Sequence, residues 1–298
     1  MSYHKPVMLQ ECLDGLNINP NGVYVDVTFG GGGHSKAILE KLDKGTLISF
    51  DQDPDAEANA PVDDRFIFVP QNFRYLKKFC KLNGFPKVDG ILADLGVSSH
   101  QFDSAERGFS IRFDADLDMR MDQSSELTAQ KVINEYDEAD LHRIFGMYGE
   151  IINSKTLAKT IAVARLREPI NTIAQLKEIV KPLVKRGKEN QYYAQLFQAI
   201  RIEVNQELEA LQEMLEQSVE ILNPGGRLVV MSYHSLEDRM VKNFINKGKF
   251  KGDVEKDFFG NEIKPFEQLT RKAIVPTAEE IKENNRARSA KLRIGMKL

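Results

Sequence analysis

The chain has 298 residues, of which 42% are hydrophobic and 29% charged, the composition of an ordinary soluble globular protein of one large domain or two smaller ones. Its formal net charge of −3 excludes a globally basic nucleic-acid binder, so an RNA or DNA partner would have to be met by a local basic patch. Two cysteines without a CxxC pattern, no apolar run approaching ~18 residues and no signal-peptide pattern predict a cytoplasmic protein without a membrane span.

Residues 21–100 alternate strand and helix signals at short spacing. Strands are predicted at 23–27, 45–50, 65–69 and 88–94, and helices at 33–42 and 73–82. Apolar strands that alternate with helices are typical of βαβ units on a parallel sheet.

From about residue 104 to residue 206 the periodicity is helical, and no convincing strand signal occurs. Helices are predicted at 126–134, 138–145, 151–166, 173–184 and 193–220, and a last strand at 226–232 follows a predicted turn at 223–226. The sequence therefore predicts an α/β core formed by residues 1–104 and 207–298, interrupted by an all-helical insertion at 105–206.

Four consecutive glycines, Gly30 to Gly33, stand between the first predicted strand and the first predicted helix. Glycines at such a turn take positive φ and let a ligand approach the backbone, although the run alone also fits a plain tight turn. The dinucleotide pattern GxGxxG is broken because Ser35 or Lys36 occupies its sixth position, and the P-loop ending is absent. The remaining pattern, acid-x-Thr-x-Gly-x-Gly-Gly from Asp26, resembles the first motif of S-adenosylmethionine (SAM) methyltransferases.

Acidic residues also end the second and fourth predicted strands, at Asp51 and Asp94. In an open parallel sheet the carboxyl ends of the strands face the ligand crevice, so Asp26, Asp51 and Asp94 are predicted at one edge. A carboxylate at Asp51 could accept hydrogen bonds from both ribose hydroxyls, a feature that NAD sites share. Taken alone, Asp51 also fits a helix N-cap, although Asp53 before a proline fits that role better.

Longer motifs along the chain resemble those of one family. They are HKPV at 4–7, DVTFGGGGHS at 26–35, DGILADLGVSSHQ at 89–101, RGF at 107–109, LDMRMD at 117–122, YGE at 148–150, FQAIRIEVN at 197–205, SYHSLEDR at 232–239 and NRAR at 285–288. In this order the motifs resemble the RsmH (MraW) family of bacterial 16S rRNA cytosine-N4 methyltransferases. They extend over essentially the whole chain.

The resemblance implies a Rossmann-like α/β methyltransferase core with a helical insertion, and S-adenosyl-L-methionine as the methyl donor. It implies that the acceptor is N4 of a cytidine (position 1402 in the usual rRNA numbering) in 16S rRNA of the 30S subunit. The family's cofactor contacts correspond to Gly32, Gly33, His34, Asp51, Phe73, Asp94 and Gln101. One departure is visible, because Tyr233 stands where the family usually has phenylalanine, which keeps the aromatic ring.

Methylation of cytosine N4 requires help from the protein, because the lone pair of this nitrogen is delocalised into the ring. A hydrogen-bond acceptor on the amino hydrogens would take up the developing positive charge. DNA amino-methyltransferases use an Asp/Asn-Pro-Pro-aromatic motif at the end of the fourth strand, whereas this chain has DLGVSS at 94–99. We predict that Asp94, or a main-chain carbonyl beside it, orients N4, and that Ser98 and Ser99 line the pocket. Since the resemblance also makes Asp94 a cofactor contact, both roles stay open.

Histidines and the charged run after the last predicted strand have alternative interpretations. His34 fits a general base, a cofactor contact or a helix-start contact, and His234 fits either a catalytic role or a hydrogen bond that fixes a loop. Glu237, Asp238 and Arg239 are predicted to form a local ion network. No metal site is predicted, because the histidines are scattered without ligand spacing: His4, His34, His100, His142 and His234.

A protein that binds the phosphates of RNA requires clustered lysine and arginine side chains. The candidate patches are 286–297, 242–251 and 181–188, each of which also fits a solvated basic face. A target base must be unstacked or extruded, for which Arg107 and Phe109 could supply a phosphate contact and a stacking ring, although Phe109 equally fits the core.

Two other functions fit the chain less well. They are a small-molecule SAM methyltransferase and a non-catalytic RNA-binding or assembly protein, and the missing third glycine disfavours a nicotinamide oxidoreductase. The sequence predicts neither an oligomeric state nor whether naked RNA or the assembled 30S particle is the substrate.

Overall fold

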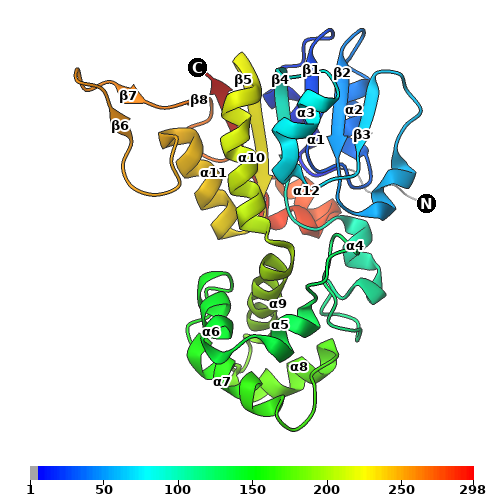
Figure 1. The fold of residues 1–298 in the computed structure, drawn as a ribbon, viewed down its shortest axis with the longest axis vertical. Coiled ribbons are helices and arrows are strands. Elements are labelled where there is room, and N and C mark those ends of the chain that lie inside the picture. Colours follow the sequence, from blue (N-terminus) through cyan, green and yellow to red (C-terminus); the bar gives the residue numbers. More distant parts are fainter. Residues whose placement is uncertain (1–5) are drawn as a thin grey trace. The chain divides into compact units, whose positions relative to one another are not determined.

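The computed structural model describes residues 6–298, so His4 of the first family motif lies outside the described residues. Internal contacts group the chain into two units (Figure 1). The first contains the residues up to Gly96 together with Leu208–Leu298, and the second contains Val97–Glu207. No helix in the described part of the chain is long and apolar enough to cross a membrane.

The first unit is built on a seven-stranded sheet with the order β3-β2-β1-β4-β5-β9-β8. Neighbours among β1 to β5 are parallel, whereas β9 runs antiparallel to both β5 and β8. The strands are β1 (Val23–Asp26), β2 (Thr46–Phe50), β3 (Phe66–Val69), β4 (Val88–Asp94), β5 (Leu222–Ser232), β8 (Phe266–Gln268) and β9 (Lys291–Lys297), and β6 (Glu255–Lys256) and β7 (Glu262–Ile263) form a separate pair.

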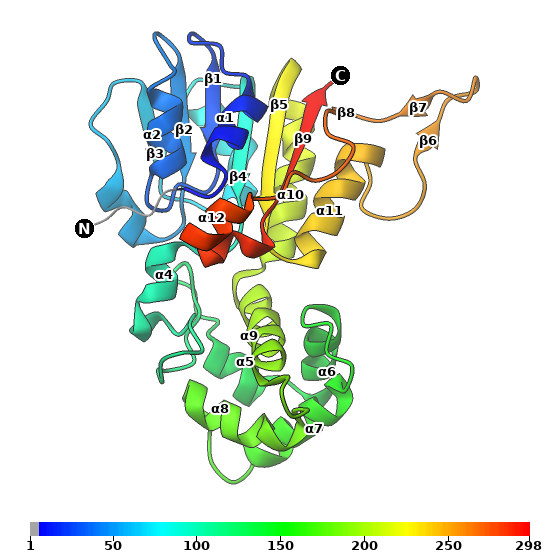
Figure 2. The ribbon, with the colours of Figure 1, turned by 180° about the vertical axis from the view of Figure 1, so that it is seen from behind.

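Helices cover both faces of this sheet (Figures 1 and 2). One face is covered by α3 (Leu76–Leu82), α10 (Glu207–Ile221) and α11 (Ser235–Lys247). The other face is covered by α1 (Leu9–Leu16), α2 (Gly33–Leu39) and the segment that contains α12 (Ala278–Glu283). Short 3₁₀ turns occur at Pro54–Asn59, Phe73–Tyr75 and Asn285–Ser289.

Alternation along the strands explains the two layers, because successive side chains of a strand point to opposite faces. Val25, Ile48 and Ile91 pack in the cluster with α3, α10 and α11. Their chain neighbours Tyr24, Leu47 and Leu92 pack in the cluster with α1 and α2. A strand that is buried on both faces reads as an uninterrupted apolar run, which is why the central strands were predictable.

The predicted α/β fold is confirmed, and the five predicted strands correspond to β1 to β5. The predicted turn at 223–226 is wrong, since β5 already begins at Leu222. The pairing of β4 with β5 shifts from Val88–Leu222 to Gly90–Arg227, and Gly225 has a φ of 81°. The Asn-Pro-Gly-Gly sequence therefore forms a bulge within the strand, where glycine supplies the positive φ.

Strands β8 and β9 were not predicted. In β9 the apolar residues Leu292 and Ile294 alternate with Lys291 and Arg293. Arg293 is only 8% exposed, and its Nε donates a hydrogen bond of 2.7 Å to Oδ1 of Asp238 on α11. Lys291 Nζ lies 3.2 Å from Oδ2 of the same carboxylate. Two cations of the candidate RNA patch at 286–297 therefore belong to an ion network that fastens β9 to α11.

The second unit is helical. Its helices are α4 (Ser99–Asp103), α5 (Ala129–Glu135), α6 (Glu138–Met147), α7 (Ser154–Ala164), α8 (Ile173–Val180) and α9 (Glu189–Asn205), with 3₁₀ turns at Ala105–Arg107 and Lys181–Leu183. Helix α6 packs against α7 and α9, α7 packs against α8, and α5 packs against α9. The single helix predicted at 193–220 is wrong, because Gln206 takes a left-handed conformation (φ 50°) that ends α9 before α10 begins.

Replacement of Asp238 by alanine should destabilise the first unit. The change leaves the buried Arg293 guanidinium without its carboxylate, and removal of one partner of such a pair costs about 3 kcal/mol. Urea unfolding should show this loss in the free energy of unfolding. Arg288→Ala is the matched control, since Arg288 is an exposed cation of the same tail and its loss should change stability by under ~0.5 kcal/mol. Equal stability of both variants would show that the Asp238 network does not hold β9.

Candidate active site at the strand ends

Strands β1 and β4 lie side by side, although β2 and β3 separate them in the sequence. The strand order reverses at this place, and ligands of open α/β sheets bind beyond the carboxyl ends of the strands at such a point. Asp26 pairs with Leu92, so β4 extends two residues further and carries Asp94 to the edge. The topology therefore brings the glycine turn after β1 next to the end of β4.

The glycine turn needs glycine for different reasons at different positions. Gly30 and Gly32 have φ angles of 51° and 75°, the left-handed region that favours glycine. A Cβ on Gly33 would lie 2.4 Å from Cγ of Pro6, so this glycine allows the N-terminal segment to pack on α2. At Gly31 no heavy atom of the described chain lies within 4 Å of such a Cβ. Open space therefore adjoins the main chain at Gly31.

Asp26 is fully buried and holds the turn from beneath. Its Oδ2 accepts a hydrogen bond of 2.7 Å from Ser35 Oγ, which also lies 2.8 Å from Ser49 Oγ on β2. Its Oδ1 accepts one of 3.1 Å from the Thr28 amide. Burial raises the pKa of this carboxyl, and the nearby His34 ring and these hydrogen bonds oppose that rise. The first of the three strand-end acids is thus a structural group.

Asp51 connects the end of β2 to the glycine turn. Its Oδ2 accepts a hydrogen bond of 2.7 Å from the Gly30 amide, and its Oδ1 accepts one of 2.8 Å from the Asp53 amide. Burial raises the pKa of Asp51 to about 6. The helix cap belongs to Asp53, whose side chain accepts from the Asp55 amide. Each oxygen of Asp51 keeps a second lone pair for a ligand hydroxyl.

Phe73 follows β3, the outer neighbour of β2. It begins a 3₁₀ turn capped by Asn72, and its half-buried ring packs against the core. Asn72 Nδ2 donates a hydrogen bond of 2.8 Å to Oε1 of Gln52, the residue after Asp51. The segments that follow β2 and β3 are therefore joined directly.

Asp94 is held by contacts on both carboxylate oxygens. Tyr233, which follows β5, donates its hydroxyl to Oδ1 over 2.8 Å, and His34 Nδ1 lies 3.7 Å from Oδ2. The Asp94 amide donates a hydrogen bond of 2.7 Å to the hydroxyl of Thr28. The side chain is 24% exposed, and burial raises its pKa to about 6. Asp94 is thus a fixed acceptor that keeps access to solvent and titrates close to neutrality.

His34 is buried, with 6% of its surface exposed, and occupies the first turn of α2. Its Nε2 lies 3.1 Å from the carbonyl oxygen of Val7. Because a carbonyl only accepts, Nε2 carries a hydrogen and donates it. His34 therefore joins the N-terminal segment to the neighbourhood of Asp94, which corresponds to the helix-start interpretation.

His234 caps α11. Its side chain accepts from the Glu237 amide, while the Glu237 carboxylate accepts from the amides of Tyr233 and His234. Glu237 is 2% exposed. This reciprocal pair is a capping box with histidine in place of serine, and it fixes the turn that presents Tyr233. The structure thus shows the hydrogen bonds that the loop-fixing interpretation of His234 predicts.

Ser98, Ser99 and Gln101 belong to the second unit. Ser98 Oγ accepts a hydrogen bond of 3.2 Å from the Gln101 amide, and Gln101 Oε1 accepts one of 3.0 Å from the Ser98 amide. These bonds form the capping box of α4, in which Ser99 is the first residue. The hydroxyl of Ser98 and the side chain of Gln101 thus have a demonstrated local role.

Arg107 and Phe109 are buried, with 7% of each residue exposed. Arg107 Nη2 donates to the carbonyl oxygens of Arg120 and Met121 over 3.1 and 3.2 Å. It thereby supports the LDMRMD loop, in which the side chain of Asn205 also bonds to the backbone of Met119 and Met121. The structure favours the core interpretation of Phe109 over a stacking ring.

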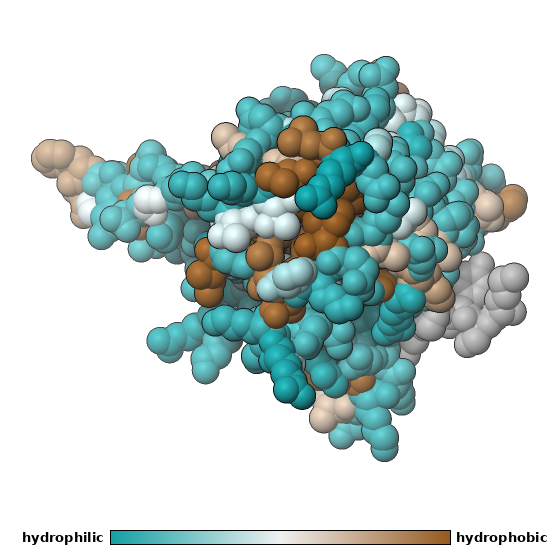
Figure 3. All heavy atoms as spheres, turned by 90° about the horizontal axis from the view of Figure 1, so that it is seen from below, coloured by the Kyte–Doolittle hydropathy of each residue, from teal (hydrophilic) through white to brown (hydrophobic). Residues whose placement is uncertain are grey.

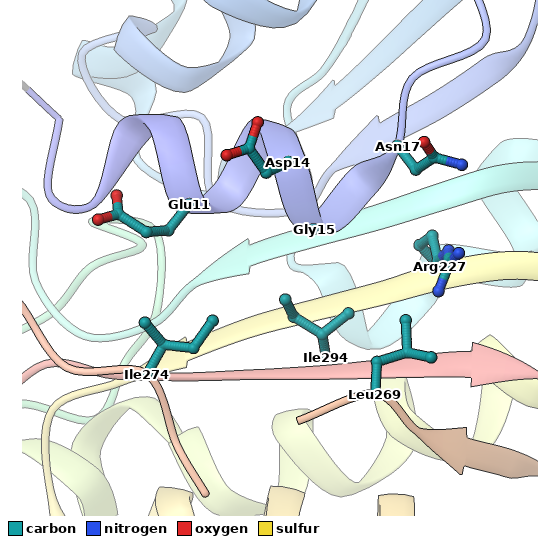
Figure 4. Close-up of a pocket in the computed structure, with 8 residues that line it drawn as sticks. All are labelled: Glu11, Asp14, Gly15, Asn17, Arg227, Leu269, Ile274 and Ile294. Atoms are coloured by element: carbon teal, nitrogen blue, oxygen red, sulfur yellow. The ribbon is translucent and has the colours of Figure 1, made fainter. Parts of the chain in front are cut away.

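A separate hollow of about 340 Å³ lies against the sheet beside α1 (Figure 4). Arg227 at its wall pairs with Gly90, whereas Asp94 pairs with Met231. The hollow is thus displaced along β4 and β5 toward the opposite ends of the strands. Its lining residues are Glu11, Asp14, Gly15, Asn17, Arg227, Leu269, Ile274 and Ile294, which include none of the strand-end acids.

A model of the MraW methylase family matches residues 1–298. The chain belongs to the MraW methylase family. The resemblance seen in the motifs is therefore confirmed over the whole length.

Several curated relatives carry the name Ribosomal RNA small subunit methyltransferase H. One from Cytophaga hutchinsonii is 59% identical over 98% of this chain and 98% of its own length. Others from Flavobacterium johnsoniae and Bacteroides thetaiotaomicron are 58% and 55% identical over 100% of this chain and 99% and 98% of theirs. Among solved structures, an rRNA methylase from Streptococcus thermophilus aligns over 100% of this chain and 99% of that chain with 12% identity and a TM-score of 0.44, on which the family assignment does not depend.

Sequence reasoning missed the contacts that join distant segments. Tyr233 was noted only as an aromatic replacement, yet its hydroxyl binds Asp94 across 139 residues. The one available signal was the hydroxyl itself, since a tyrosine near a buried edge needs a partner for it. The hydroxyl of Thr28 accepts a hydrogen bond from the Asp94 amide. In the sequence, Thr28 stood out only as a member of the glycine motif.

Two carboxyl groups should titrate near pH 6, and carbon-13 NMR of the side-chain carboxyls can detect them. Asp51→Asn should remove one titration and Asp94→Asn the other. Because the folded pKa lies above the unfolded value of about 3.9, these groups favour folding below pH ~4, and that contribution is lost as pH rises through about 6. Asp94→Asn should therefore flatten the fall in unfolding free energy between pH 4 and 7. Titration of both groups near pH 4 would contradict the burial argument.

Proposed function

We propose that this chain transfers a methyl group from S-adenosyl-L-methionine to N4 of a cytidine near position 1402 of 16S rRNA in the 30S subunit. Membership of the MraW methylase family supports methyl transfer, and the relatives named as small-subunit rRNA methyltransferases support the RNA class. The observation that carries the choice of an amino nitrogen is the carboxylate of Asp94, fixed at the switch point of the sheet. A substrate of this kind also supports a cytoplasmic location.

The strand-end residues fit SAM. The main chain at Gly31 adjoins open space, so a ligand can approach it without meeting a side chain. The Asp51 carboxylate is anchored by two amides and retains lone pairs for the two ribose hydroxyls. We propose that Gly32, Gly33, His34, Phe73 and Gln101 complete the site. In that case Gly33 and His34 act mainly by holding the turn, as their contacts with Pro6 and Val7 indicate.

Bound SAM would supply a methyl group on a sulfonium, which is already a good leaving group. The protein must then align and deprotonate the nucleophile. Oδ1 of Asp94 contacts Tyr233 and Oδ2 lies near His34, which leaves lone pairs on both oxygens for an N4 hydrogen. As N4 takes up the methyl group, Asp94 would accept the N4 proton and would later release it to water. Its pKa of about 6 suits this exchange near neutral pH.

We propose further that the unit Val97–Glu207 is the helical insertion predicted at 105–206 and that the other unit is the methyltransferase core. Ser98 and Ser99 would then contribute through the start of α4. Since the Ser98 hydroxyl already caps that helix, its effect on the pocket is one of position. In this proposal Asp94 is the group that accepts the proton from N4.

Asp94→Asn should lower kcat for N4-methylcytidine formation by about 10² to 10⁴-fold, the usual contribution of a positioned base. The assay incubates the protein with SAM and 30S subunits lacking their native methylations, followed by nucleoside mass spectrometry of the 16S rRNA. Asp64→Asn, a change of an exposed loop carboxylate, is the matched control and should leave kcat unchanged. Calorimetry should show SAM still bound by Asp94→Asn. Full turnover of that variant would overturn the role of Asp94, and formation of another methylated nucleoside would overturn the substrate assignment.

Tyr233→Phe should shift the pH dependence of the reaction. The tyrosine hydroxyl stabilises the ionised carboxylate of Asp94, so its removal should raise the pKa of Asp94 above about 6. A neutral-to-charged hydrogen bond contributes roughly 1.5 kcal/mol, which corresponds to about 1 pH unit. The acidic limb of the kcat/KM profile should move upward by that amount, while activity above pH 8 changes little. An unmoved limb would show that Tyr233 does not act through Asp94.

A further inference from the structure

A two-stranded hairpin projects from the first unit. It consists of β6 and β7, joined by residues 257–261, and it does not pair with the seven-stranded sheet. Figures 1 and 2 show it extending away from α11 and β8. The strands pair through Glu255–Ile263 and Lys256–Glu262, and their residues are exposed. The hairpin therefore contributes little to the core of the unit.

The tip of this hairpin presents two phenylalanines to solvent. Phe258 is 98% exposed and Phe259 is 85% exposed, and their ring centroids lie 5.6 Å apart at 87°. Figure 3 shows hydrophobic residues at the far end of this arm, beyond a largely hydrophilic stem. Single exposed apolar residues are common. Burial of each ring against a partner would nevertheless stabilise the complex by about 1.5–3 kcal/mol. Such a display is typical of a contact surface.

The turn that carries the rings is internally ordered. Asp257 Oδ1 accepts hydrogen bonds of 2.8 Å from the amides of Phe259 and Asn261, and its Oδ2 accepts one of 2.8 Å from Asn261 Nδ2. The Asp257 amide donates to the Asn261 carbonyl, and Gly260 has a φ of 87°. Because the backbone is already fixed, little conformational entropy is lost when the rings bind a partner.

Charge near the hairpin distinguishes among partners. Residues 242–272 contain eight lysines and arginines and five acidic residues, whereas the whole chain has a net charge of −3. Lys249 and Lys264 form ion pairs with Glu255 and Glu262, which neutralise two of the acids. Six cations of this segment form no ion pair with a carboxylate of residues 6–298, although Lys247 donates a hydrogen bond to the Gly252 carbonyl oxygen: Lys242, Lys247, Lys251, Lys256, Arg271 and Lys272. Aromatic rings on a segment with an excess of cations match a polyanion with flat, stackable groups.

We propose that the hairpin tip binds rRNA, with Phe258 and Phe259 stacking on unpaired bases and the neighbouring lysines contacting phosphates. This inference rests on the proposed rRNA substrate. Base–aromatic stacking contributes ~1–3 kcal/mol per base, and any ring-bearing base satisfies it. The tip thereby adds affinity for single-stranded segments of the rRNA substrate, whose bases are free to stack.

The test compares variants at the two tip positions. A double variant with Phe258→Ala and Phe259→Ala, the alanine pair, should raise KM for undermethylated 30S subunits at least about tenfold. Its kcat and SAM affinity should be unchanged. The pair Phe258→Tyr and Phe259→Tyr keeps the stacking faces and should behave as the parent protein. The pair Phe258→Leu and Phe259→Leu keeps apolar surface without a π-face and should behave as the alanine pair. Leu166→Ala, which removes an exposed side chain of the second unit, is the control and should change nothing.

Binding of 16S rRNA by fluorescence anisotropy separates this inference from the proposed function. If the parent protein forms no N4-methylcytidine, the proposed function fails, but loss of RNA affinity in the alanine pair would still support the hairpin. Lys251→Ala with Lys256→Ala should reduce the slope of log K against log salt by about 1 to 2. Retention of rRNA affinity by the leucine pair would overturn stacking as the contribution of the tip. Loss of self-association in sedimentation, with RNA affinity intact, would assign the tip to a second copy of the chain.

Discussion

The hydrogen bonds between β1 and β4, completed by the bond from the Asp94 amide to the Thr28 hydroxyl, join two strand ends that lie 66 residues apart. Everything in the candidate site is arranged around this junction. The glycine turn leaves from one strand, Asp94 ends the other, and Asp26 lies buried below both. If the junction opened, the main chain at Gly31 and the carboxylate of Asp94 would no longer lie at one edge of the sheet.

The carboxylates at this edge have a thermodynamic consequence. Asp51 and Asp94 are held where burial raises the pKa of each to about 6, so the folded chain keeps them ionised at neutral pH at some cost in stability. Amide donors to Asp51 and the hydroxyl of Tyr233 at Asp94 reduce that cost without removing it. A bound nucleoside or amino group would supply the missing donors. Perturbed carboxyls in a recess are typical of functional sites for this reason.

Much of the fold could be predicted, because strands buried on both faces are apolar without interruption and turns carry glycine. The same logic fails for β9, where Lys291 and Arg293 alternate with Leu292 and Ile294 and resemble a solvated basic tail. The partner that makes Arg293 a buried residue, Asp238, is 55 residues away. The break between α9 and α10 was missed since nothing in local propensity marks Gln206 as left-handed.

The candidate site was predictable to a similar degree. Strand ends and glycines are local signals, and they led to Gly32, Gly33, Asp51 and Asp94 at one edge. The capping role of Ser98 could also have been read locally from the spacing to Gln101. The bond from Tyr233 to Asp94 and that from His34 to Val7 depend on packing between distant segments, which no local pattern encodes.

The contact between Tyr233 and Asp94 also sets an order of events during synthesis. The glycine turn, Asp51 and Asp94 leave the ribosome early, but the partner hydroxyl is translated 139 residues later. At ~5–20 residues per second, roughly 7 to 28 s separate the two. The interval is longer still for the amide of Met8, which is next to Val7, the residue that binds His34. Its hydrogen-bond acceptor, Glu280 Oε1 at 2.6 Å, is translated 272 residues later. A nascent chain therefore carries all the acids of the crevice before it can hold them in place, and competence for methyl transfer should arise only as the last strand is completed.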